Sequence, residues 1–143
     1  MKEFVNRFAV AAPPERVWTV MEEIERWPGW TPTVTRVEPL QSGPAQVGAK
    51  YKLKQPGMPA AVWEVTAWEP GRGFVWVSRS LGMTSTAEHA VVAASGGSEV
   101  TLRVVFRGPL SGVVACLFGK MTERFVAQEA EGLKKRAESP QAR

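Results

Sequence analysis

VAAPPERVW, at Val10–Trp18, decides the fold of this chain, because it marks the point where a first strand gives way to a helix. Consecutive prolines cannot continue a central strand, since they have no amide hydrogen to donate to a neighbouring strand. At the first positions of a helix the missing amide costs nothing, so Pro13 and Pro14 favour a helix start. The sequence WPGW, at Trp27–Trp30, then predicts the turn that ends a second short helix.

Hydrophobic periodicity extends this interpretation in both directions. Residues 2–10 alternate between two sides with a period of two, which predicts the first strand. Residues 13–24 have apolar positions at helical spacing, and a short helix or turn continues to Trp27. Strand, helix and short helix therefore follow one another within the first thirty residues.

The rest of the chain predicts a run of strands followed by one long helix. Alternating segments, separated by turns rich in glycine and proline, predict strands at residues 33–40, 49–54, 60–69, 74–79, 84–94 and 99–107. Turns of hairpin size make these strands antiparallel neighbours. Residues 110–136 carry apolar side chains every three or four positions, which predicts the long helix.

This order of elements predicts an α+β fold. A curved antiparallel sheet of about seven strands would wrap around the long C-terminal helix, with two short helices after the first strand. A chain of 143 residues favours a single domain, which we expect at 1–138, with a flexible tail at 139–143. One helix cannot fill the concave side of such a sheet, so we expect a cavity between the helices, the sheet and the loops.

Composition excludes several kinds of site. The chain has no aspartate and a single histidine, His89, which rules out metal sites built from several histidines and a Ser-His-Asp triad. No glycine-rich phosphate loop precedes a helix. We therefore expect neither a metal nor a cofactor. Cys116 is the only cysteine, so it cannot form an internal disulfide, and its apolar neighbours predict a small buried side chain.

The N-terminus and the hydropathy predict a cytoplasmic protein. Charged residues appear early in Met1–Phe4, so a signal peptide is not expected. No stretch approaches the ~18 continuous apolar residues of a membrane span. Basic and aromatic residues do not interleave as they do on surfaces that stack bases, so no nucleic acid is expected as a partner.

The net charge is +4, and three lysines on one side of a predicted strand contribute to it. They are Lys50, Lys52 and Lys54. A solvated strand face is the simpler interpretation, because charge of this kind commonly serves solubility. A basic surface that binds an acidic partner is the alternative.

Several features together resemble the START-like helix-grip (SRPBCC) superfamily, and within it the polyketide cyclase/dehydrase and lipid-transport-like subgroup. They are the segments Ala12–Trp18 and Trp27–Trp30, Val47–Ala49 before a strand, the pair Glu69–Pro70, and the closing helix. The resemblance extends over essentially the whole chain and implies a ligand cavity. The superfamily serves lipid carriage, hormone binding, polyketide cyclisation and co-chaperone work without a universal catalytic motif, so the resemblance implies no particular reaction.

Candidate ligand-binding residues are those that the pattern turns toward the expected cavity or places at its rim. The aromatic ones could line a pocket or fill the core, and the methionine of the 55–59 turn suits an adaptable entrance. Asn6, between two phenylalanines, could anchor a ligand or be satisfied by backbone groups. The full set is Asn6, Phe8, Trp27, Met58, Trp63, Phe74, Trp76, His89, Phe106, Leu117, Met121 and Phe125.

His89 is the one candidate for chemistry. On its strand it could donate to a ligand oxygen or act as a general acid/base, or it could be a buried histidine bonded to a neighbour. The strand carboxylates Glu64 and Glu88 are expected on the outer face, which leaves the imidazole without an orienting carboxylate.

These observations favour the binding of a hydrophobic or aromatic small molecule, lipid or polyketide-like, in an internal cavity. One alternative is a polyketide cyclase/dehydratase-like enzyme in which His89 moves protons. Another is a protein-interaction module that uses the basic strand face. The sequence makes no prediction of an oligomeric state.

Overall fold

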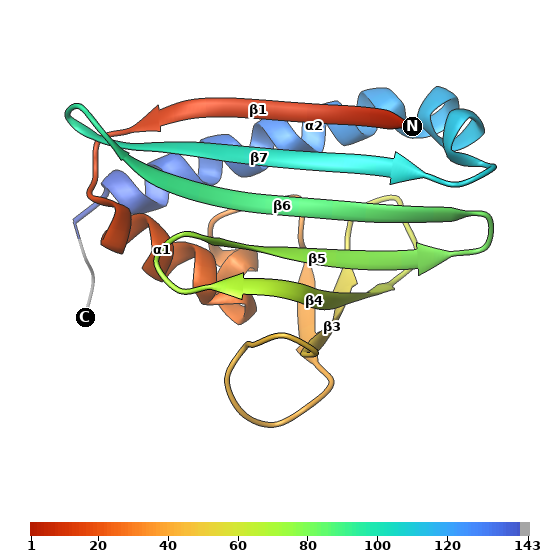
Figure 1. The fold of residues 1–143 in the computed structure, drawn as a ribbon, viewed down its shortest axis with the longest axis horizontal. Coiled ribbons are helices and arrows are strands. Elements are labelled where there is room, and N and C mark those ends of the chain that lie inside the picture. The colour runs from red at the N-terminus through yellow and green to blue at the C-terminus, as the bar shows by residue number, and fades with distance from the viewer. Residues whose placement is uncertain (141–143) are drawn as a thin grey trace.

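The computed structural model describes residues 1–140, and Figure 1 shows the arrangement of its elements. Residues 141–143 of the expected tail lie outside the described residues. A strand and two short helices come first, six further strands follow, and a long helix ends the chain. The elements are β1 (Lys2–Val10), α1 (Pro14–Glu22), the 3-10 helix η1 (Ile24–Gly29), β2 (Arg36–Pro39), β3 (Lys50–Lys54), β4 (Ala61–Glu69), β5 (Gly73–Ser80), β6 (Met83–Ala94), β7 (Gly97–Arg107) and α2 (Ser111–Glu138).

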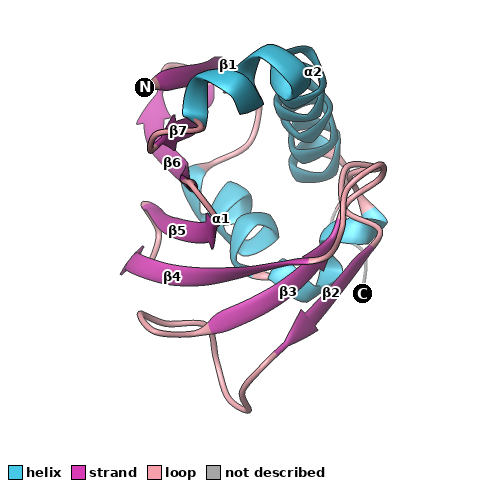
Figure 2. Ribbon diagram, turned by 90° about the vertical axis from the view of Figure 1, so that its right-hand side faces the viewer, coloured by secondary structure: helices cyan, strands magenta, loops and turns pink. Residues whose placement is uncertain are grey.

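The predicted α+β helix-grip architecture is confirmed. Seven strands form one antiparallel sheet in the order β1-β7-β6-β5-β4-β3-β2, so each strand from β2 to β6 pairs with its successor and β1 pairs with β7. Figure 2 shows the sheet curving around the helices, which gather on its concave side. Helix α2 packs against β1, β7 and α1.

The two prolines start α1 as the sequence predicts. Pro13 is extended and precedes the helix, and Pro14 is its first residue. The carbonyl of Pro13 accepts the amides of Arg16 and Val17 at 3.0 and 3.2 Å, which forms the first helical turn. The missing proline amides therefore leave no donor unsatisfied.

The same segment also holds the last turn of α2. The amide of Ala11 donates to Glu138 Oε2 at 2.8 Å. Arg16 donates from Nη2 to the carbonyl of Arg136 at 3.0 Å and from Nε to that of Ala137 at 3.4 Å. Carbonyls at a helix C-terminus lack partners within the helix, and a guanidinium both bonds them and complements the helix dipole. Residues 10–18 thus fix where the long helix ends as well as where the first strand ends.

The predicted strand at residues 33–40 is shorter in the structure, where β2 begins at Arg36. Thr31 and Thr33 are buried, and their hydroxyl groups lie 2.8 Å apart in a hydrogen bond. The Thr33 amide also donates to Thr31 Oγ1 at 3.2 Å. Local bonding of threonine side chains competes with a strand ladder, so these residues form a buried corner before the strand.

The first turns of α2 are more exposed than the sequence predicts. Cys116 is exposed rather than buried. Its neighbours Val113 and Leu117 are exposed too, whereas Val114 and Ala115 of the same run are half-buried against the core. Within residues 1–140, no helix combines the length and the apolar character that a membrane crossing needs.

Aromatic packing fills the interior below α1 and η1. Trp27 is buried, and its Nε1 donates to the carbonyl of Met21 at 3.1 Å. Its ring meets that of Trp76 at 5.3 Å between centroids, and Trp18 meets Trp68 at 5.1 Å. Edge-to-face contacts of this kind stabilise a core beyond the area they bury. These rings fill the interior beneath α1, and Trp27 and Trp76 also form part of the wall of a cavity.

Candidate functional site

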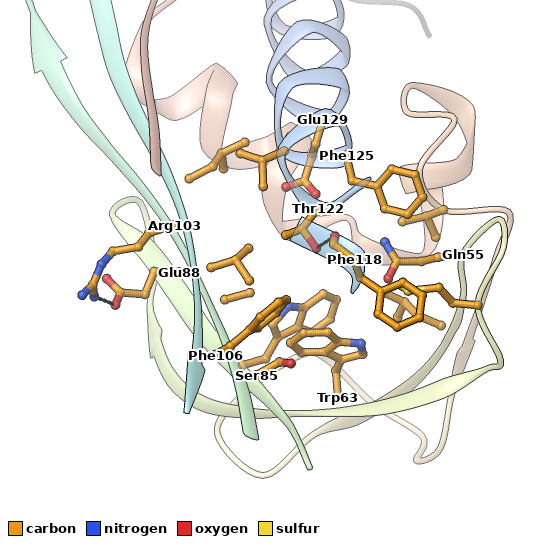
Figure 3. Close-up of a pocket in the computed structure, with 18 of the residues that line it drawn as sticks. Gln55, Trp63, Ser85, Glu88, Arg103, Phe106, Phe118, Thr122, Phe125 and Glu129 are labelled. Atoms are coloured by element: carbon orange, nitrogen blue, oxygen red, sulfur yellow. Dashed lines mark hydrogen bonds and ion pairs between the residues drawn. The ribbon is translucent and has the colours of Figure 1, made fainter. Parts of the chain in front are cut away.

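A cavity of about 440 Å³ lies between the concave side of the sheet and α2. Figure 3 shows the side chains that project into it from the sheet, from α2 and from the loop around Gln55. Most of the side chains that line it are apolar. Pockets for small molecules measure about 300–1,000 Å³ and have mostly apolar walls with a few polar groups. The cavity fits that description in both size and lining.

Seven of the twelve residues that the sequence singles out line this cavity. They come from η1, the loop between β3 and β4, the strands β4 to β7, and α2. They are Trp27, Met58, Trp63, Trp76, His89, Phe106 and Phe125. The alternation along the strands therefore identified the concave face, although the binding role of these residues stays a prediction.

The other five lie elsewhere. Asn6 lines a separate hollow between β1 and α2, which pack against each other. Phe8 packs against the core, and Phe74 stacks on the far side of the His89 ring at 4.3 Å. Leu117 is 70% exposed. Met121 lies near the 55–59 loop, where its Sδ is 3.9 Å from the position of a Cβ on Gly57.

His89 is held in an aromatic cage on the inner face of β6. The side chain is 6% exposed, and its register partners are Phe74 on β5 and Leu102 on β7. The Phe74 ring is nearly parallel to the imidazole, and those of Trp27 and Trp76 lie 5.3 and 5.9 Å away. Close packing on these sides fixes the orientation of the ring.

A carboxylate from the long helix faces this imidazole. Glu129 Oε2 lies 3.3 Å from His89 Nε2, and the Glu129 side chain is 18% exposed. Both residues line the cavity. The contact is an ion pair when the imidazole is protonated. When the imidazole is neutral, a carboxylate beside one ring nitrogen favours the tautomer whose hydrogen is on that nitrogen.

Glu129 was not identified from the sequence as a site residue. The alternation that places His89 on its strand does not show which turn of the distant helix α2 will face it. The spacing of residues along α2 could have pointed to Glu129. Four side chains three or four positions apart share one face of the helix, and all of them line the cavity. They are Thr122, Phe125, Val126 and Glu129. A carboxylate within such a stripe is a candidate for a buried polar role.

Two buried nitrogen atoms near the cavity have no hydrogen-bond partner among the described residues. They are Nε1 of Trp63 and Nδ1 of His89. Figure 3 shows the Trp63 indole lying among the side chains that face the cavity. An unsatisfied buried polar group costs roughly 1–3 kcal/mol, so a ligand oxygen that accepts from the indole would recover that free energy.

The strand carboxylates Glu64 and Glu88 belong to the outer face of the sheet, as the sequence predicts. Figure 3 shows Glu88 and Arg103 pointing away from the other lining side chains. Arg103 Nη1 donates to Glu88 and Nε donates to Glu3, and these bonds raise the pKa of the guanidinium. Glu64 lies 3.8 Å from Arg79. Glu64 and Glu88 are therefore both paired with arginines, although atoms of Glu88 and Arg103 border the cavity.

The basic strand face is smaller than three lysines suggest. Lys50 and Lys52 are exposed, whereas Lys54 is half-buried and donates from Nζ to the carbonyls of Gln55 and Met58. Lys54 thus holds the loop at the cavity rim. In the described part of the chain, no three His, Cys or acidic side chains lie close enough together to hold a metal ion.

Comparison with known proteins agrees with this architecture. The family described as "Polyketide cyclase / dehydrase and lipid transport" matches residues 1–138. No curated protein matches the sequence.

Several solved structures share the fold. Protein jhp0584 of Helicobacter pylori is 9% identical with a TM-score of 0.82, over 95% of this chain and 88% of that one. TTHA0849 of Thermus thermophilus is 17% identical with a TM-score of 0.76, over 95% and 97%. The di-domain ARO/CYC StfQ from the steffimycin biosynthetic pathway is 16% identical with a TM-score of 0.72, over 95% of this chain and 50% of that one. With the family match extending over residues 1–138, the chain belongs to the polyketide cyclase/dehydrase and lipid-transport family.

Proposed function

We propose that this protein binds an apolar or aromatic small molecule in the cavity, with the polar end of the ligand near His89 and Glu129. One observation carries the proposal: an apolar cavity of about 440 Å³ with a histidine–carboxylate pair in its wall. Burial of the ligand supplies the affinity, and the few polar groups orient it. The family description and the likeness to StfQ favour ligands of the lipid or polyketide type.

The charges in the cavity wall restrict the ligand further. Glu129 is an acceptor, so a ligand hydroxyl or amine suits it, whereas a ligand carboxylate would place two negative charges together. The Trp63 indole offers a donor to a ligand oxygen. A phenolic or polyhydroxylated aromatic compound meets both requirements.

The test is binding of a neutral fluorescent probe, N-phenyl-naphthylamine, to the purified protein and to a variant whose cavity is filled. Ala87 lines the cavity on β6, and Ala87→Phe should abolish probe binding. Ala90→Phe is the matched control, because Ala90 is exposed on the same strand and that variant should bind like the wild type. Equal binding by the Ala87→Phe variant, or no binding by the wild type, would contradict the proposal. Native mass spectrometry of the purified protein then searches for a co-purified ligand.

The contact between His89 and Glu129 favours a second candidate function, a cyclase/dehydratase-like enzyme. Here His89 would transfer a proton to or from a bound polyketide chain, and Glu129, 3.3 Å from its Nε2, would orient the imidazole. Replacing His89 by Ala should abolish turnover of a linear poly-β-ketone while leaving the affinity for it unchanged. Turnover that survives this substitution would refute a catalytic histidine and leave the binding function in place.

A further inference from the structure

One end of the molecule carries exposed apolar side chains beside the cavity. We call this surface the mouth patch; its members come from the hairpin between β5 and β6 and from the start of α2. They are Leu81, Leu110, Val113, Leu117 and Phe118. Leu81 is 96% exposed and Leu117 is 70% exposed. Large apolar side chains gathered at one place mark an interaction surface more often than singly scattered ones do.

Backbone contacts join the two parts of the mouth patch. The amide of Leu110 donates to the carbonyl of Gly82 at 2.9 Å. The Leu110 side chain also covers Gly82 closely, because a Cβ placed there would lie 2.6 Å from Leu110 Cδ1. Val113 and Leu117 follow Leu110 at helical spacing and so share its side of α2. Figure 1 shows this hairpin and the start of α2 at the same end of the molecule.

The mouth patch adjoins the cavity. Phe118 belongs to the patch and also lines the cavity. Ser80 and Met83, on either side of the exposed hairpin tip, line the cavity as well. A partner that covers the mouth patch would therefore also lie against the residues that line this part of the cavity.

Three basic side chains lie beside this apolar surface. Arg79 and Arg107 flank Thr84 in the register of three adjacent strands, and Lys120 is exposed one turn beyond Leu117. Arg79 lies 3.8 Å from Glu64, but neither Arg107 nor Lys120 forms an ion pair with any carboxylate in the described part of the chain. Free cations beside exposed leucines complement a surface that is anionic outside and apolar within.

We propose that the mouth patch docks on an anionic lipid bilayer. Leu81, Val113 and Leu117 would enter the boundary between headgroups and acyl chains, while Arg107 and Lys120 contact lipid phosphates. A second copy of the chain fits less well, since a two-fold contact through this patch would place these cations near their own copies. Docking would bring the cavity against the bilayer, so that an apolar ligand need not cross water. The docking surface itself does not depend on the identity of that ligand.

The test is flotation of the protein with phosphatidylcholine vesicles, prepared with and without phosphatidylglycerol. We expect binding to the anionic vesicles that weakens as salt is raised. Each basic residue at such a surface strengthens partitioning by about fivefold, so Arg107→Gln with Lys120→Gln should weaken it by roughly tenfold or more. Leu81→Gln with Val113→Gln should weaken it by at least about tenfold, because two apolar side chains lose their burial.

Matched controls keep this test specific. Val62→Gln with Val92→Gln changes exposed valines on β4 and β6, and Lys50→Gln with Lys52→Gln changes exposed cations on β3; both variants should float like the wild type. Thermal unfolding checks that every variant is folded. The proposal is overturned if the wild type stays unbound, or if the control pairs weaken binding as much as the mouth-patch pairs do. A wild-type dimer in solution that Leu81→Gln with Val113→Gln dissociates would equally overturn it, by assigning the patch to a second copy.

Discussion

At the scale of single residues, Glu129 determines which ligands the proposed site accepts. Naphthol and naphthoate have the same ring system, but naphthol offers a hydroxyl donor and naphthoate carries a negative charge. We expect the wild type to bind naphthol more tightly, since the carboxylate of Glu129 accepts from the hydroxyl and repels the anion. Glu129→Gln removes the charge at nearly the same size and should reduce the preference by roughly tenfold. Titrations followed by tryptophan fluorescence measure both affinities.

A matched control for that measurement is Glu131→Gln, two residues along the same helix. Glu131 is exposed and lies 3.9 Å from Lys135, so this variant should keep the wild-type preference. A preference that is unchanged in Glu129→Gln would mean that the carboxylate does not face the bound ligand.

His89 shows what could be predicted about a residue and what could not. Alternation along its strand placed it on the inner face, because in a strand each side chain points opposite to its neighbours. Its partner Glu129 lies forty residues later on a helix, and the rotation and shift of a helix against a sheet depend on the packing of the whole interface. Phe74 shares the inner side but lies behind the imidazole, which a count of alternating positions cannot show.

At the scale of elements, the position of α2 depends on Gly132, where the helix passes close to Trp30 after η1. A Cβ on Gly132 would lie 2.0 Å from the carbonyl oxygen of Trp30, so the helix could not keep its position. We expect Gly132→Ala to lower the free energy of unfolding by about 1–3 kcal/mol, despite the better helix propensity of alanine. Gly112→Ala is the control on the same helix, because nothing lies within 4 Å of its Cβ position. That variant should be neutral or more stable in urea unfolding, and a stable Gly132→Ala variant would contradict the close packing.

The C-terminal turn of α2 should make stability depend on pH. Glu138 accepts from the Ala11 amide and from Lys134, and these bonds lower the pKa of its carboxyl below the ordinary value of 4.5. A carboxyl with a lowered pKa in the folded state stabilises the protein above the unfolded pKa and loses this contribution as pH falls through the folded value. Glu138→Gln should therefore be less stable than the wild type at pH 7, and the difference should shrink as the pH falls below 4.5 and disappear once it is below the lowered pKa of the folded state. Urea unfolding across this range measures it, and a constant difference would contradict the assignment.

The ends of helices and strands could be predicted where they depend only on neighbouring residues in the sequence. The prolines at positions 13 and 14 fixed the start of α1, since their effect on the backbone needs no tertiary partner. The strand expected at 33–40 is shorter because Thr31 and Thr33 bond to each other inside the fold. Cys116 was expected in the core because the run around it is apolar, yet an apolar run becomes core only where another element covers it.

At the scale of the whole molecule, the cavity couples ligand binding to stability. The sequence predicted unfilled space from one helix facing seven strands, but its volume and its polar lining depend on side chains from distant elements. A ligand that binds only the folded state stabilises it by about 2.7 kcal/mol at a free concentration one hundred times its Kd. For a domain of this size, that corresponds to a rise in Tm of roughly 5–10 °C. We therefore expect N-phenyl-naphthylamine to raise the Tm of the wild type and of Ala90→Phe by this amount, measured by circular dichroism. Ala87→Phe should show no rise, because its cavity is already filled. A similar rise in all three proteins would mean that the probe binds outside the cavity. That result would contradict the proposal that the cavity is the ligand-binding site.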